Sequence, residues 1–171
     1  MIYKVPFYSQ FSDVKDSYWA ARSCSIVNLK MILDFFDVDS PNIDDLIKNA
    51  YKEGLYGPWG WKQKNLIEFA EGFGLITHRE DFNNFDRGLG KIKAHLDSGG
   101  LVIASIAKRI LGNRRYHSIL VIGYEEGDSL ELLYYHDPEL LDGAKKKSYF
   151  VDKETFEKDW RKMAMFFSKK P

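Results

Sequence analysis

Residues 21–33 read ARSCSIVNLKMIL, where a polar segment passes into a long apolar one. Apolar side chains recur at Ile26, Leu29 and Leu33, and further apolar residues cover most of the remaining faces. A helix that is apolar nearly all round lies inside a domain. The pattern therefore predicts a buried central helix over residues 23–36, and the fold is built outward from it.

The rest of the first half favours helices, and the second half favours strands. Apolar residues at helical spacing predict helices over residues 40–54, 62–74 and 89–100. Runs rich in Val, Ile, Leu and Tyr predict strands over 101–107, 117–126, 130–138 and 147–153, then a helix over 153–163 and a strand over 164–169. The turn EGDS at 126–129 predicts an antiparallel hairpin. Together these elements predict one α+β domain spanning residues 1–171.

Composition narrows the function classes. The 25 Lys and Arg residues balance 25 Asp and Glu residues without a basic block, so the chain lacks the electrostatic footprint of a nucleic-acid-binding protein. One cysteine and four scattered histidines show no metal-ligand spacing, and no phosphate-binding glycine loop is present, so we predict no metal and no cofactor. No signal peptide or membrane-spanning apolar stretch is visible. We therefore expect no membrane insertion and a cytoplasmic location, with a processed exported form as the open alternative.

The only cysteine, Cys24, lies in the first turn of the predicted central helix. The positive end of the helix dipole there favours a thiolate and lowers the thiol pKa, as a nucleophile requires. A small buried core residue is the competing interpretation, because free cysteine is among the most buried residue types.

A cysteine nucleophile needs a general base and a group that orients the base. His117 heads an otherwise apolar predicted strand, whereas His78 and His95 lie in charged segments and are expected on the surface. Asp137 ends the next predicted strand, so a hairpin would bring it to the same end of the sheet as His117. His136 is its competitor, but adjacent strand residues face opposite sides. The structural alternatives are that His117 is an ordinary histidine at a strand edge and that Asp137 only starts an Asp-Pro turn.

Six short motifs occur in one order along the chain. They are VPFYSQ (5–10), SCSIVNLKMIL (23–33), SGGLVIASI (98–106), HSILVIGYE (117–125), HDP (136–138) and FEKDW (156–160). In this order the chain resembles the papain-like cysteine peptidases, most closely the bacteriocin-processing peptidases that cut double-glycine leaders. The similarity spans nearly the whole sequence.

The resemblance implies a helical half, with its central N-terminal helix, packed against an antiparallel sheet. It also implies roles for Cys24 as nucleophile, His117 as base and acid, Asp137 as the orienting carboxylate and Gln10 as an oxyanion donor. Two features depart from the family pattern. Ser25 stands where the family usually has glycine, and Cys24 follows Gln10 by fourteen positions, so residues 11–21 have to loop out for the amide to reach the site.

The predicted function is therefore that of a cysteine-dependent hydrolase. It would be a peptidase that acts on a peptide or protein substrate and forms an acyl-enzyme on its own Cys24. Two alternatives stay open: a catalytically inactive papain-like domain that binds peptides or partners, and an acyl or amide transferase on the same scaffold. Trp59 and Trp61 either wall a substrate cleft or cap the core. The basic residues within 108–115 either border the cleft, favouring an acidic substrate, or form a solvated hairpin tip.

Overall fold

The structure is a computed structural model that describes residues 1–110, 113–127, 131–141 and 149–170, with no side chains described over 108–115. Its helices are α1 (Ser17–Ala20), α2 (Cys24–Phe35), α3 (Ile43–Lys52), α4 (Gln63–Glu71), α5 (Phe85–Asp97) and α6 (Lys153–Asp159). Its strands are β1 (Tyr56–Gly57), β2 (Gly60–Trp61), β3 (Leu75–Asp81), β4 (Leu101–Ile110), β5 (Asn113–Glu126), β6 (Glu131–His136), β7 (Tyr149–Asp152) and β8 (Trp160–Lys169).

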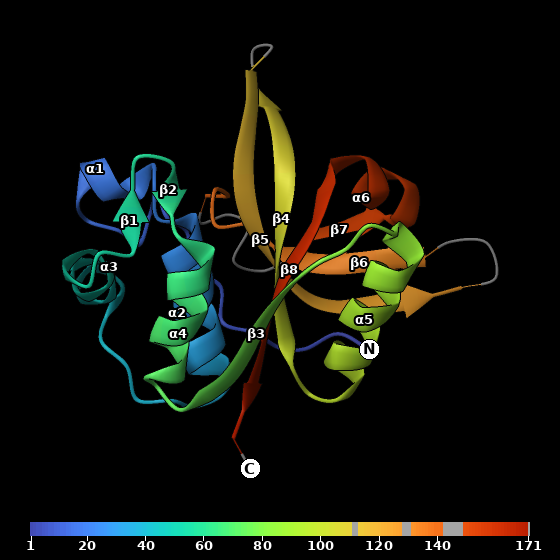
Figure 1. The fold of residues 1–171 in the computed structure, drawn as a ribbon, viewed down its shortest axis with the longest axis horizontal. Coiled ribbons are helices and arrows are strands. Elements are labelled where there is room, and N and C mark those ends of the chain that lie inside the picture. Colours follow the sequence, from blue (N-terminus) through green and yellow to red (C-terminus); the bar gives the residue numbers. More distant parts are fainter. Residues whose placement is uncertain (111–112, 128–130, 142–148, 171) are drawn as a thin grey trace.

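One antiparallel sheet of six strands, ordered β3-β8-β4-β5-β6-β7, forms the centre of the molecule. Helices α1–α4 and the small β1–β2 hairpin lie on one side of it, and α5 and α6 lie on the other (Figure 1). This arrangement confirms the predicted α+β class, with a helical half packed against an antiparallel sheet.

Helix α2 is the buried central helix that the sequence predicts. Ile26, Leu29 and Leu33 have no exposed surface, and the helix packs against β5. Burying each such side chain contributes about 1.5–3 kcal/mol of transfer free energy. Because α2 begins at Cys24, this packing holds the thiol at the sheet face beside β5.

The β4–β5 hairpin extends beyond the rest of the sheet as a two-stranded ribbon (Figure 1). β8 pairs with β4 only as far as Ile106, and β6 pairs with β5 only from Leu120 onward. His117 pairs with Ile106, at the point where the six-stranded sheet gives way to the ribbon. The prediction that His117 heads its strand was therefore wrong, because β5 begins at Asn113.

Other elements also differ from the predicted ones. β3 was missed, since most of its side chains are half-buried or exposed and it pairs with the C-terminal strand β8. α5 begins earlier, at Phe85, because the Asn84 side chain caps it by accepting a hydrogen bond from the Arg87 N–H (2.8 Å). β8 begins at Trp160, inside the predicted helix 153–163, although the Trp160 ring still stacks on Phe156 (5.2 Å between centroids). The predicted EGDS turn and strand 147–153 fall partly outside the described residues.

The N-terminal segment is tied to the sheet on its way to Gln10. Tyr3 donates its N–H to the Ile122 carbonyl (2.9 Å), and the His136 ring bonds the Val5 carbonyl (3.0 Å). Gly123 permits this close approach, because a Cβ there would lie 2.4 Å from the Met1 carbonyl oxygen. The motif glycine in HSILVIGYE thus makes room for the N-terminal segment.

Candidate active site

Cys24 is the first residue of α2 and is half-buried. Its thiol lines a cleft of about 660 Å³, whose other walls include His117 and Ser118 of β5. The N–H groups of the first helical turn have no partners within the helix, so the thiol sits at the positive end of the helix dipole. Cys24 is thus a cleft residue, and the alternative of a closed core position is wrong.

His117 and Asp137 meet across the β5–β6 hairpin, as their positions in the sequence predict. The His117 ring is buried, and its Nε2 lies 2.6 Å from Oδ1 of Asp137. Asp137 follows β6 directly and also accepts a hydrogen bond from the Glu139 N–H (2.9 Å). Because an ionised carboxylate only accepts hydrogen bonds, Nε2 carries the proton and Nδ1 is left for the thiol.

The electrostatics of the pair favour separated charges. Burial lowers the pKa of His117, but the hydrogen bond to Asp137 and the neighbouring Cys24 raise it to about 9. Burial raises the pKa of the Cys24 thiol, but the His117 ring, the Ser118 backbone and the Ser25 hydroxyl lower it to a net value below the ordinary one. Nδ1 of His117 makes no hydrogen bond among the described residues, and such loose contacts are common before substrate binds.

Glu139 is a site residue that the sequence analysis missed. Its Oε1 lies 3.6 Å from Nδ1 of His117, and the carboxylate is largely buried. The imidazole thus lies close to two carboxylates from a single turn, Asp137 and Glu139. The only signal in the sequence is the acidic residue two positions after Asp137 in HDPE.

Gln10 lies at the Asp137 turn despite the long interval before Cys24. Its N–H donates to the Pro138 carbonyl (2.7 Å), and its side chain is fully buried. The intervening residues turn out of the way through a bend and the short helix α1. Neither Oε1 nor Nε2 of Gln10 has a hydrogen-bond partner among the described residues. A buried amide without partners is rare in folded proteins.

The serine that follows Cys24 faces the sheet. The Ser25 hydroxyl lies 3.1 Å from that of Ser118 and 4.0 Å from the Cys24 thiol. This buried pair of hydroxyls links α2 to β5 directly beneath the thiol. Ser25 thus occupies the space that the usual glycine would leave open.

The other histidines have structural positions. His136 is buried and bonds the N-terminal segment, so it faces away from the site, as the strand alternation predicts. His78 is exposed and stacks on Phe166 (4.5 Å between centroids). His95 is half-buried and bonds the Phe167 carbonyl (2.9 Å), so the expectation of a surface position was wrong for it.

Aromatic rings form one wall of the cleft. Trp61 is half-buried and packs with Trp19 and Tyr56, at centroid distances of 5.6 and 5.1 Å. Trp59 is 100% exposed at the cleft mouth. Trp61 therefore packs partly against the core, as the core-capping alternative predicts. Trp59 faces solvent at the cleft mouth and does not cap the core. The basic side chains of 108–115 lie outside the described residues.

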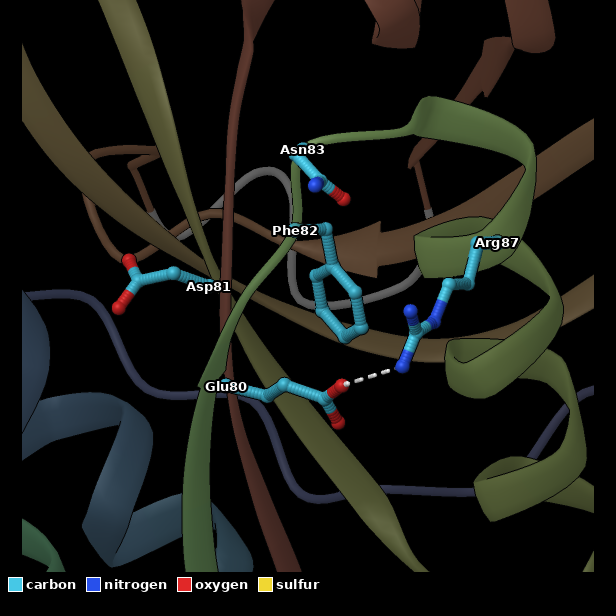
Figure 2. A pocket seen from close by; sticks show the side chains of 5 residues that line it. All are labelled: Glu80, Asp81, Phe82, Asn83 and Arg87. Carbon is cyan, nitrogen blue, oxygen red and sulfur yellow. Dashed lines mark ion pairs between the residues drawn. The ribbon is translucent and has the colours of Figure 1, made fainter.

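A second hollow, of about 410 Å³, lies between the end of β3 and the start of α5 (Figure 2). Arg87 pairs there with Glu80 at 4.0 Å, and none of the side chains that line it is a nucleophile. Within the described residues no group of three His, Cys, Asp or Glu side chains is arranged to hold a metal ion. No helix in that part of the chain has the length and apolar character needed to cross a membrane.

The fold and most of the sequence are similar to known proteins. A solved double glycine motif protease from an AMS/PCAT transporter, in complex with the leader peptide, superposes with a TM-score of 0.65 at 16% identity over 99% of this chain and 94% of that one. The peptidase domain of Streptococcus ComA, a bifunctional ABC transporter involved in quorum sensing, gives 0.57 at 17% identity over 88% and 93%. No curated protein matches. The model of the Peptidase_C39 like family matches residues 2–165, so the chain belongs to that family and is a cysteine peptidase-like hydrolase.

Proposed function

We propose that residues 1–171 form one peptidase domain that hydrolyses a peptide bond through an acyl-enzyme on Cys24. One observation carries this proposal. A buried imidazole is held at 2.6 Å by Asp137 in the same cleft as a thiol at a helix N-terminus. Nucleophile, base and orienting carboxylate are the three parts that covalent catalysis requires.

In the proposed reaction the Cys24 thiolate attacks the carbonyl carbon of the scissile bond. His117, as imidazolium, gives its proton to the leaving amine as the C–N bond breaks. A water molecule then attacks the thioester and loses a proton to His117. The C–S bond breaks, which releases the acid and restores the Cys24 thiolate and the His117 imidazolium. Asp137 holds the ring through Nε2 and stabilises its positive charge throughout, and Glu139 adds a second negative charge near Nδ1.

Gln10 is the proposed side-chain donor to the oxyanion. Its buried amide has no partner among the described residues, so the Nε2 hydrogens are not committed elsewhere. The side chain is not among those that line the cleft, so the proposal requires the amide to turn toward the substrate oxygen as negative charge develops there. The Cys24 N–H at the start of α2 supplies a second donor of the kind that helix N-termini leave unpaired. Such groups stabilise the transition state more than the bound substrate.

Replacing Gln10 by Leu should lower kcat about 100-fold or more while raising stability. The loss reflects a missing oxyanion donor, typically a factor of about 10²–10³. The gain arises because a buried amide without partners costs about 1–3 kcal/mol, a penalty that leucine removes. Peptide hydrolysis and urea unfolding of the same samples measure both. Gln10→Ala is the control for side-chain loss without apolar filling. An unchanged kcat would remove Gln10 from the mechanism.

The substrate is proposed to be a peptide cut after two small residues, as the name of the solved double glycine motif protease suggests. The hydrogen-bonded Ser25 and Ser118 both line the cleft that holds the thiol, and we propose that they limit the room for a large side chain beside the scissile carbonyl. Peptides with a Gly-Gly pair, or with Ala-Ala or Leu-Leu in its place, should be cut after the pair in the order Gly, Ala, Leu. Mass spectrometry locates the bond. Equal cleavage of all three would contradict this specificity.

Two alternatives give different results in the same assay. A catalytically inactive domain would leave every peptide intact yet retain peptide binding. With an added amine such as hydroxylamine, the acyl-enzyme of a hydrolase also gives some amide product, because the amine competes with water. A transferase would give more of this product than that competition explains. The partnerless buried amide of Gln10 favours turnover, because an unsatisfied buried amide lowers stability and a binding module has no need of it.

A further inference from the structure

We infer that the cleft recognises a substrate carboxylate close to the scissile bond, and that Arg161 and Arg22 bind it from two walls. Arg161 belongs to β8 of the sheet, and Arg22 lies just before Cys24 on the helical side. Both line the cleft that holds the thiol. The inference rests on the proposed peptidase function and narrows its substrates to acidic peptides.

Arg161 is held in a defined position. Its guanidinium lies 3.5 Å from the centroid of the Tyr116 ring, and its Nη1 donates to Ser105 Oγ at 3.4 Å. Tyr116, His117 and Arg161 all line the cleft, so the stacked cation lies in the same cleft as the imidazole. A guanidinium stacked on an aromatic ring loses less freedom when it binds a carboxylate, because its plane is already oriented.

An irregularity in the β4–β8 ladder accompanies this placement. Trp160 pairs with Ile106 and Ala164 pairs with Ala104, so three residues of β8 stand opposite Ser105 alone. Within that bulge Lys162 has φ of 54°, a left-handed conformation that is unfavourable for a residue with a side chain. Bulges and strained residues of this kind redirect side chains near functional sites. Here the bulge takes Arg161 out of the regular ladder and lets it line the cleft.

Arg22 is oriented in a comparable way. Its guanidinium lies 4.2 Å from the Tyr18 ring centroid, and its Nη1 donates to the Tyr18 carbonyl at 2.8 Å. The Trp61 indole donates to the Arg22 carbonyl at 2.6 Å, which fixes the backbone just before the nucleophile. The second cation is therefore tied to the aromatic wall.

The charge balance of the cleft distinguishes these two arginines from the others described. Arg79 and Arg87, which do not line the cleft, each pair with a carboxylate, Arg87 with Glu80 as Figure 2 shows. Arg22 and Arg161 have no carboxylate partner among the described residues, and no Asp or Glu is among the described residues that line the cleft. Two oriented cations without counter-charges fit an anionic ligand, and guanidinium pairs with carboxylate through two parallel hydrogen bonds.

The charge of the cleft can be measured without a peptide substrate. Iodoacetate is anionic and iodoacetamide is neutral, and both alkylate the same thiolate. We expect Arg161→Gln and Arg22→Gln each to lower the iodoacetate-to-iodoacetamide rate ratio at Cys24 by about threefold at low ionic strength. Added salt should reduce the difference. Arg161→Lys keeps the charge and should keep most of the ratio.

Arg87→Gln is the matched control, since it removes an exposed arginine that lies in the separate hollow and should leave the ratio unchanged. An unchanged ratio in both cleft variants would overturn this inference and leave the peptidase mechanism intact. Failure of the wild-type thiol to react with either reagent would instead overturn the proposed function, and the inference with it.

Peptides then identify the source of the carboxylate. Matched substrates carry Glu or Gln next to the cleaved pair, each with a free or an amidated C-terminus. An acidic side chain as the ligand predicts about tenfold higher kcat/KM for Glu over Gln with either terminus, lost in Arg161→Gln. A terminal α-carboxylate as the ligand predicts the preference for the free acid alone. No preference for either carboxylate would refute the assignment.

Discussion

Replacing Cys24 by Ala should abolish peptide hydrolysis, with kcat at least roughly 10⁵-fold below that of the wild type. The covalent step requires the sulfur, and no other cysteine exists in the chain to replace it. The fold should be unaffected, because the thiol lines a cleft and removing it opens no internal cavity. Initial rates on a cut peptide, together with circular dichroism and thermal unfolding, measure both parts.

Cys24→Ser is the informative companion. It keeps size and polarity but replaces a thiol of lowered pKa by a hydroxyl that does not ionise near neutral pH, so we expect it to be nearly as inactive. Trapping the acyl-enzyme in the wild type by rapid acid quench should give a mass increase confined to the peptide that contains Cys24. Undiminished hydrolysis by Cys24→Ala would rule out the mechanism.

His117→Ala should cost almost as much, and the two losses should not add in the double variant. Members of one catalytic unit fail together, because each acts only through the others. The structure also predicts a pH signature. The thiolate–imidazolium pair persists from the lowered pKa of Cys24 up to the pKa of His117 at about 9. Activity should therefore fall on the acid side as the thiolate is protonated, and above about pH 9 as the imidazolium loses its proton.

Alkylation by iodoacetamide tests this without a substrate. Wild-type Cys24 should react fast well below pH 7, whereas in His117→Ala the rate should follow an ordinary thiol titration near pH 8.5. His78→Ala is the matched control, because that exposed ring stacks on Phe166 outside the cleft. Thermal unfolding of each variant separates a lost ion pair from a lost fold. Identical pH profiles for wild type and His117→Ala would show that no ion pair forms.

The spacing of apolar residues along the sequence predicted the helices and strands whose buried face can be identified from that spacing alone. The apolar residues of α2 and the apolar core of β5 follow from spacing alone; α2 is where the sequence predicts it, and β5 contains the predicted strand but begins four residues earlier. The order of Gln10, Cys24, His117 and Asp137 identified the candidate site. A short hairpin joins the strands that carry the last two, so their meeting follows from local chain geometry.

Contacts between distant segments decided the rest. β3 is an edge strand with few buried side chains, so its sequence has only a weak strand pattern. Its backbone hydrogen bonds within the sheet are made with β8, far away in the sequence. β8 begins at Trp160, because pairing with β4 outweighs the helical spacing there. Arg161 reaches the cleft only through the bulge in that ladder, and Glu139 reaches the His117 ring only through the turn after Asp137. A shift of one residue in strand register turns a side chain to the opposite face, and the tertiary structure alone sets that register.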